Sequence, residues 1–273
     1  MTLVTLSTDI GQQDYIVPAL KGQLISNAPQ AQIIDITHYL SQSNLPEAAY
    51  LCSNAFSYYP ANTIHIVLLN FFEIARPHVL ITKHNNQYII CADNGWLTML
   101  LEKTPSEVYA LPINTKQTFL QITQQISKAV AHICNGKPLE EIAQQTTDII
   151  VKHPLKPTAS ENWIKGQIIF IDNFENVVIN ITKSFFEEHR KGRSFKIAFK
   201  RNETIEALSN NYLSIHEGEK LAWFNSAGYL EIAINKGNMA GLFGLQGFNE
   251  IMYKEGKAMQ NKWFYQTITV FFE

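Results

Sequence analysis

The sequence predicts an α/β N-terminal domain, with a mainly parallel sheet and covering helices, followed by a C-terminal all-β barrel-like domain. Strand and helix patterns alternate over the first half, whereas short strands separated by turn residues fill the second. Between them Lys152–Thr158 (KHPLKPT) holds two prolines and no periodicity. We therefore predict an N-terminal domain over 1–151, a linker over 152–165 and a C-terminal domain over 166–273.

The N-terminal elements follow from hydrophobic spacing. Alternating, β-rich or continuous apolar stretches predict strands at Met1–Ser7, Ala31–Ile36 and Thr63–Leu69, and helical spacing predicts helices at Tyr15–Ser26 and Leu45–Tyr58. This β-α-β-α-β order favours parallel strands. Further on we expect strands at His78–Lys83 and Tyr88–Cys91, helices at Trp96–Leu101 and Ser127–Cys134, and a short amphipathic segment at Glu140–Thr146.

The sequence pattern of the second half predicts an all-β sandwich or small barrel. Its expected strands are Gly166–Ile171, Val177–Ile181, Ser194–Phe199, Lys220–Phe224, Tyr229–Ile234 and Thr267–Phe272. Turn residues separate them, and no internal repeat is found.

Composition narrows the function classes. The 273 residues are 46% apolar and 17% charged, which is globular, and the net charge of −2 offers no basic stripe for nucleic acid. No apolar run is long enough to span a bilayer, and the N-terminus lacks a signal pattern, so we expect a cytoplasmic protein that contacts no membrane. The three cysteines, Cys52, Cys91 and Cys134, lie far apart among apolar residues and predict small buried side chains and no metal site.

Several short motifs occur in order along the chain. They are Ser7-Thr8-Asp9-Ile10-Gly11, Ile33–His38, Asp93-Asn94-Gly95, Ile171–Asn176 and Asn225-Ser226 with Gly228–Ala233. Together they resemble the S-adenosylmethionine (SAM) hydrolases that form adenosine, the SAM hydroxide adenosyltransferases, which are related to fluorinase and chlorinase. Any one motif is weak, but the ordered set covers both domains.

The resemblance implies a fold and a reaction. It implies homotrimers with an α/β N-domain and a β-barrel C-domain, in which SAM binds between one subunit's N-domain and its neighbour's C-domain. A water, activated as hydroxide, attacks the ribose C5′ and expels methionine. A sulfonium is a good leaving group, so in-line positioning and a desolvated nucleophile supply much of the barrier reduction. SAM is the substrate or ligand, and no other cofactor is expected.

The same resemblance assigns candidate ligand-binding residues. Asp9 would bind the ribose hydroxyls, with a helix cap or turn as the alternative. Asp172 and Asn176 would make polar contacts on the adenine side and Phe174 would stack on the base, with an ordinary hairpin turn as the alternative. Glu175 stands where the family has a glycine. Glycine would be preferred there if the turn needs a positive φ at this position.

Three more residues have assigned roles. Ser226 and Glu231 would hold the methionine part, although Glu231 also fits an outward-facing strand position. Asn94 would lie near the reaction centre, with a turn residue as the alternative.

The water-activating residues depart from the family pattern. Where the family has an Asp the chain has Asn70, which cannot take a proton from water, and where it has a His the chain has Leu120. Arg76 is retained, so Arg76 and Asn70 are the candidate catalytic residues. Glu73, His65 and His78 are the nearby ionisable replacements, and both histidines fit strand positions.

Three readings follow from these residues. The protein is an active SAM hydrolase with rearranged water activation, or a degenerate homologue that binds SAM or adenosine without turnover. The third is an unrelated α/β plus β protein whose motifs are turns.

Overall fold

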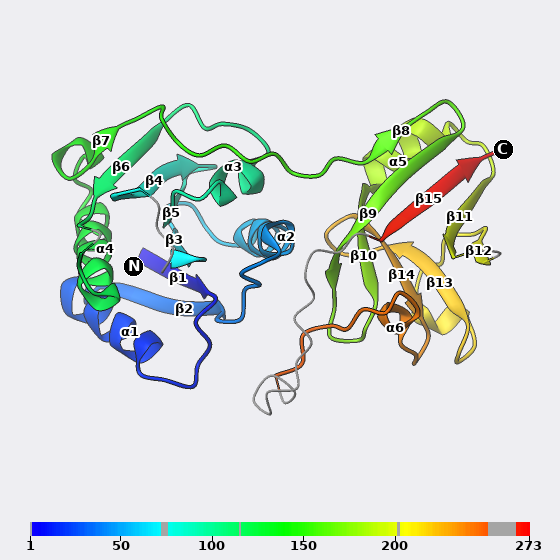
Figure 1. Cartoon of the computed structure of the whole chain (residues 1–273), viewed down its shortest axis with the longest axis horizontal. Coiled ribbons are helices and arrows are strands. Elements are labelled where there is room, and N and C mark those ends of the chain that lie inside the picture. Colours follow the sequence, from blue (N-terminus) through cyan, green and yellow to red (C-terminus); the bar gives the residue numbers. More distant parts are fainter. Residues whose placement is uncertain (1, 72–75, 115, 201–202, 251–265) are drawn as a thin grey trace. The chain divides into compact units, whose positions relative to one another are not determined.

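The chain forms two compact units, Met1–Pro154 and Leu155–Glu273 (Figure 1). The computed structural model describes residues 2–71, 76–114, 116–200, 203–250 and 266–273. The division falls at residue 154, and the long strand β9 of the second unit begins at Trp163.

A seven-stranded mixed sheet forms the centre of the first unit. Its order is β2 (Ala31–Thr37), β1 (Thr2–Thr8), β3 (Ile64–Leu68), β5 (Gln87–Ala92), β4 (His78–His84), β6 (Val108–Pro112) and β7 (Gln144–Gln145). The first four strands are mutually parallel, as expected, and the remaining pairings are antiparallel. The β4–β5 hairpin turns the chain back, so half of the sheet departs from the parallel pattern.

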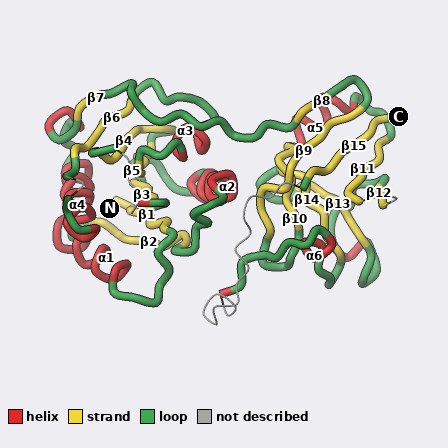
Figure 2. The backbone as a smooth tube through the Cα atoms, viewed as in Figure 1, coloured by secondary structure: helices red, strands yellow, loops and turns green. Residues whose placement is uncertain are grey.

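Helices cover both faces of this sheet (Figure 2). On one face lie α1 (Ile16–Asn27) and α4 (Phe119–Cys134), whose Leu20, Leu24, Ile126 and Val130 share a core with β1 and β3. On the other lie α2 (Leu45–Phe56) and α3 (Trp96–Leu101), which bury Cys52 and Trp96. The 3₁₀ turn η2 (Leu139–Glu141) precedes β7. Cys52 and Cys91 are buried as predicted, whereas Cys134 is only partly buried.

The sequence patterns underestimated two N-terminal elements. Helix α4 begins at Phe119, eight residues before the predicted start. The pattern is weak there, because this half of the helix buries only one stripe, including Ile122 and Ile126, between exposed or partly buried glutamines. The side chain of Gln121 accepts the backbone N–H of Thr118 at 2.9 Å and so caps the helix. Strand β6 was not predicted at all.

The second unit is an antiparallel sheet that curls into a barrel shape. Its order is β12 (Glu203–Ile205), β11 (Phe195–Lys200), β15 (Thr267–Phe272), β9 (Trp163–Ile171), β10 (Val177–Thr182), β14 (Tyr229–Ile234) and β13 (Lys220–Phe224), with β8 (Thr158–Ala159) on β9. The two end strands approach each other, because Lys220 and Glu203 form an ion pair at 2.6 Å and Leu208 bridges to Ala222. The predicted fold class is confirmed.

Short helices complete this unit. They are α5 (Lys183–Arg190), the 3₁₀ turn η3 (Tyr212–Ser214) and α6 (Met239–Leu242). Helix α5 was not predicted; the hydroxyl of Thr182 caps it by accepting the N–H of Phe185 at 3.2 Å, and Phe186 fills the barrel core.

Buried His65 makes the stability of the first unit depend on pH. Its ring stacks on Phe56 at 3.7 Å between centroids, and its Nδ1 bonds the hydroxyl of Thr5 at 2.7 Å. Burial lowers the pKa of His65 from 6.5 to about 4. As the pH falls, the unfolded chain takes up a proton on this histidine before the folded chain does. The contribution of neutral His65 to the free energy of unfolding is therefore complete above pH 6.5 and decreases toward pH 4, by about 3 kcal/mol in all.

Denaturant unfolding of the first unit at pH 7 and pH 4.5 checks this expectation. The His65→Gln variant, whose neutral amide does not titrate, should lose less free energy of unfolding between the two pH values than the wild type. Equal losses in both proteins would contradict the assignment.

Candidate functional site

Three sequence-predicted residues of the first unit meet at one edge of its sheet. Asp9, Asn70 and Asn94 follow the ends of the parallel strands β1, β3 and β5. The Asp9 carboxylate accepts the backbone N–H of Asn70 at 2.8 Å, and the Asn94 amide donates to the carbonyl of Leu69 at 2.9 Å. The carboxyl ends of parallel strands are a common place for ligands in α/β sheets.

The side-chain amide of Asn70 is hydrogen-bonded to the backbone. It has φ = 51°, in the left-handed region that Asn tolerates, and its amide donates to the carbonyl of Gln42 at 2.8 Å. The next residue, Phe71, is buried and packs edge-on against Phe119 with centroids 5.7 Å apart. An amide that already donates, followed by a buried aromatic ring, supplies no base for water.

Arg76 and His78 share one buried carboxylate. The Asp93 Oδ2 atom lies 2.9 Å from His78 Nε2 and 3.4 Å from Arg76 Nε. Arg76 also pairs with Asp148 at 2.9 Å, and Asp93 Oδ1 accepts the N–H of Ile150 at 2.8 Å. Strand β4 runs antiparallel to β5, so His78 at its start lies at the same sheet edge as Asp93. Of the other replacements, His65 is buried in β3 and Glu73 lies outside the described residues.

Asn94 serves the turn at the end of β5. Its Oδ1 accepts the N–H of Trp96 at 3.0 Å while its Nδ2 bonds Leu69, and Gly95 follows with φ = 87°. The turn alternative for Asn94 therefore has direct structural support.

The turn between β9 and β10 is built by Asp172. Its Oδ1 accepts the N–H groups of Phe174 and Asn176, both at 2.9 Å. Glu175 has φ = 62°, the conformation for which the glycine is preferred. Two hydrogen bonds hold it: its Oε2 accepts from Gly247 at 2.8 Å and its carbonyl from Ala240 at 2.9 Å. The turn therefore survives the replacement.

Glu231 lies in a polar cluster and does not face outward, because only 5% of its surface is exposed. Its Oε1 accepts hydrogen bonds from Tyr212 and Trp223, both at 2.9 Å, and from Asn176 at 3.4 Å. Burial raises the pKa of Glu231, and the donated hydrogen bonds oppose this shift. Sequence reasoning missed Tyr212 and Trp223, and no motif marks them.

Phe174 and Ser226 are exposed. The ring of Phe174 is 75% exposed at the tip of the β9–β10 turn. Ser226 lies in the turn between β13 and β14, where the Oδ1 of Asn225 accepts the N–H groups of Ala227 and Tyr229 at 3.1 Å. Neither side chain is buried by its own unit.

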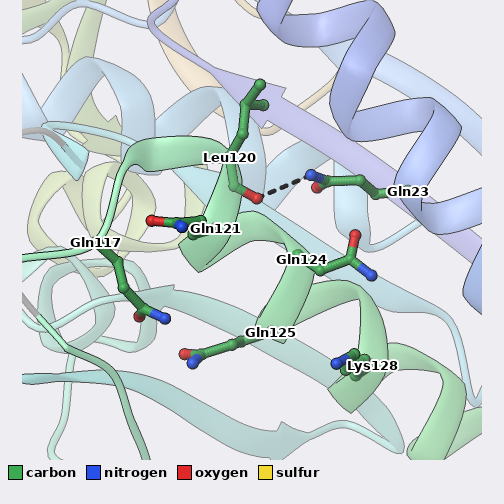
Figure 3. Close-up of a pocket in the computed structure, with 7 residues that line it drawn as sticks. All are labelled: Gln23, Gln117, Leu120, Gln121, Gln124, Gln125 and Lys128. Carbon is green, nitrogen blue, oxygen red and sulfur yellow. Dashed lines mark hydrogen bonds between the residues drawn. The ribbon is translucent and has the colours of Figure 1, made fainter.

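A hollow of about 470 Å³ lies beside α1 and α4 (Figure 3). Gln23, Gln117, Leu120, Gln121, Gln124, Gln125 and Lys128 line it. Gln23 donates to the carbonyl of Leu120 at 2.8 Å. None of the predicted site residues lines this hollow, and amides supply no general base, so we do not place the chemistry there.

Neither a metal site nor a membrane-spanning helix is found among the described residues. Among the described residues no group of three or more His, Cys, Asp or Glu side chains is arranged to hold a metal ion. Within the same part of the chain, every helix is too short or too polar to cross a bilayer.

Comparisons with known proteins place these motifs in a family. The N-terminal domain model of SAM hydroxide adenosyltransferase matches residues 4–143, and the C-terminal domain model matches residues 166–252. An (R)-S-adenosyl-L-methionine hydrolase of Methanocaldococcus jannaschii is 22% identical over 272 residues, covering 92% of this chain and 95% of the relative. A fluorinase of Actinoplanes is 22% identical over 276 residues, covering 87% and 92%.

A solved structure shares the fold. The crystal structure of an uncharacterized conserved protein from Thermotoga maritima matches with a TM-score of 0.78 and 22% identity, covering 99% of both chains. The two family models together span both units, and the reading as an unrelated protein is excluded. The chain belongs to the SAM hydroxide adenosyltransferase family.

Proposed function

We propose that this protein binds S-adenosylmethionine or adenosine and does not turn SAM over with the water-activating groups of its family. The observation that carries the proposal is Asn70: its amide donates to Gln42 where a proton acceptor is required. The curated relatives are named as SAM hydrolases and fluorinases, which supports an adenosyl ligand.

The ligand contacts follow from the chemistry of the retained residues. The Asp9 carboxylate, which accepts the backbone N–H of Asn70, is an acceptor of the kind that suits a ribose diol. The exposed ring of Phe174 offers a face for a purine, and the exposed hydroxyl of Ser226 suits the amino-acid part. We assign Asp172, Asn176, Glu231 and Asn94 to the same ligand through the positions they hold in the family pattern.

One cluster favours a second candidate, hydrolysis with rearranged water activation. Asp93 holds His78 and Arg76 together, so an imidazole, a carboxylate and a guanidinium lie at the edge that carries Asp9. A carboxylate-oriented imidazole is a common general base. In this candidate SAM is hydrolysed to adenosine and L-methionine by attack of water on C5′.

Assembly and location belong to the proposal as well. We expect a homotrimer whose neighbouring subunits share each ligand, acting in the cytoplasm and needing no cofactor other than SAM. Light scattering of the purified protein measures the assembly.

Calorimetry with chromatography tests binding and turnover together. The wild type should bind SAM and adenosine and release no methionine above the uncatalysed rate. Asp9→Asn keeps an acceptor for Asn70 but loses charge, so affinity should fall about tenfold or more. Glu217→Gln, on the exposed surface of the second unit, is the control. Absence of binding by either compound would refute the proposal.

Introducing the carboxylate and the imidazole that the family has at positions 70 and 120 should restore the hydrolysis of SAM. Asn70→Asp with Leu120→His supplies a carboxylate and an imidazole, and Asp also tolerates the backbone at position 70. Phe71 and Phe119, the neighbours of these two residues, are in contact. Because a positioned base contributes about 10²–10⁴-fold, methionine release should rise at least tenfold.

The matched control for this experiment is Asn70→Asp with Gln125→His, which puts the imidazole further along α4. A double variant that binds SAM normally but shows no gain would mean that other groups limit the reaction.

Arg76→Ala distinguishes the second candidate. If the wild type does release methionine, this change and His78→Gln should each lower the rate about 100-fold while SAM affinity stays within about threefold. Lys103→Ala, at an exposed position, is the control. Turnover that survives both substitutions would remove the Asp93 cluster from the mechanism.

A further inference from the structure

The backbone on either side of Asp9 is hydrogen-bonded to the loop that follows β2. The carbonyl of Thr8 accepts the N–H of Leu40 at 2.9 Å, and the N–H of Gly11 donates to the carbonyl of His38 at 2.7 Å. Gly11 has φ = 78°, in the left-handed region that favours glycine, so the chain turns sharply after Asp9. The shape of residues 8–11 therefore depends on residues 38–40.

The side chains of Thr8 and His38 make a second link between the same two segments. The Thr8 Oγ1 atom lies 3.0 Å from His38 Nδ1, and it accepts the backbone N–H of Ile10 at 3.3 Å. Both side chains are buried. One hydroxyl thus joins the imidazole to the backbone on the far side of Asp9, which lies between Thr8 and Ile10 in the chain.

The surroundings of His38 determine the direction of its hydrogen bond with Thr8. The other ring nitrogen, Nε2, lies 3.2 Å from Asp35 Oδ1, and Lys21 forms an ion pair with Asp35 Oδ2 at 2.5 Å. The contact with Asp35 is electrostatic, because Nε2 is buried without an aligned hydrogen-bond partner. Burial lowers the pKa of His38, and Asp35 opposes this shift, so the ring is neutral at pH 7.

A neutral imidazole carries one proton, and the neighbouring carboxylate favours it on Nε2. A lone pair on Nε2 would face a carboxylate oxygen, whereas an N–H there faces it with the opposite partial charge. Nδ1 is then an acceptor, so Thr8 donates its hydroxyl proton to His38 and accepts the N–H of Ile10. Both hydrogen-bonding functions of the hydroxyl are used to hold the turn that contains Asp9.

We propose that Thr8 and His38 are positioning residues, which hold the Asp9 carboxylate in the orientation that binds the vicinal hydroxyls of a ribose. This inference rests on the proposed function, in which Asp9 binds the ribose. Asp9 also accepts the N–H of Asn70, so the chain after β2 and the chain after β3 both restrain it. The motif Ile33–His38 thereby acquires a role in ligand binding.

A comparison of adenosine with 2′,3′-dideoxyadenosine, which lacks both hydroxyls, isolates this role. In calorimetry of the full wild-type chain, adenosine should bind on the order of 10–100-fold more tightly, the value of hydrogen bonds to a charged group. Thr8→Val keeps the shape of the side chain and removes the hydroxyl, so this preference should fall about threefold or more. Thr8→Ser keeps the hydroxyl and should keep the preference.

A second pair of variants tests the imidazole. His38→Leu removes the acceptor and should lower the preference by a similar factor, whereas His38→Asn places an amide oxygen near the position of Nδ1 and should restore most of it. Affinity for 2′,3′-dideoxyadenosine should stay within about threefold of the wild type in all four variants, because that nucleoside has no hydroxyls for Asp9. Glu217→Gln, on the exposed surface of the second unit, is the control and should change neither affinity.

The outcomes separate the inference from the function beneath it. Equal wild-type affinities for the two nucleosides would overturn the inference and leave the proposed binding of adenosine intact. Folded Thr8→Val and His38→Leu variants that keep the full preference would overturn it too, as would equal weakening of both nucleosides, the mark of a general structural role. Thermal unfolding checks folding, and if one of these two variants does not fold, the other decides. Binding of neither nucleoside nor SAM by the wild type would refute the proposed function, and the inference with it.

Discussion

Two hydrogen bonds between strand ends define the candidate site of the first unit. The Asp9 carboxylate accepts from the backbone of Asn70, and the amide of Asn94 donates to the carbonyl of Leu69. They join the chain after β1 to the chain after β3, and β3 to the turn after β5. These bonds pair polar groups of the backbone at the strand ends. The side chains lie close together because the parallel strands all end at the same side of the sheet.

Residue 70, at the same end of the sheet, is an asparagine. The backbone N–H of Asn70 donates to Asp9 and its side-chain amide donates to Gln42, and a neutral amide is no base for water. Next in sequence, the buried Phe71 packs edge-on against the partly buried Phe119. Positive charge and an imidazole are still present, but both are bound to Asp93.

The second unit contains a buried polar cluster around Glu231. Buried carboxylates are costly unless their acceptor sites are filled, and Glu231 receives donors from Tyr212, Trp223 and Asn176. These hydrogen bonds restrict the orientation of the side chains in the cluster.

The sequence by itself determined the two-part fold, most strands and the family motifs, because hydrophobic periodicity and turn residues are local signals. It also fixed Asn70 and Leu120 as departures, since residue identity alone excludes a proton acceptor. It missed half of α4 and all of α5 and β6, which depend on burial by distant elements. Only the tertiary structure placed Arg76 and His78 on Asp93, and Tyr212 and Trp223 on Glu231, because these contacts join residues on separate elements that no spacing rule connects.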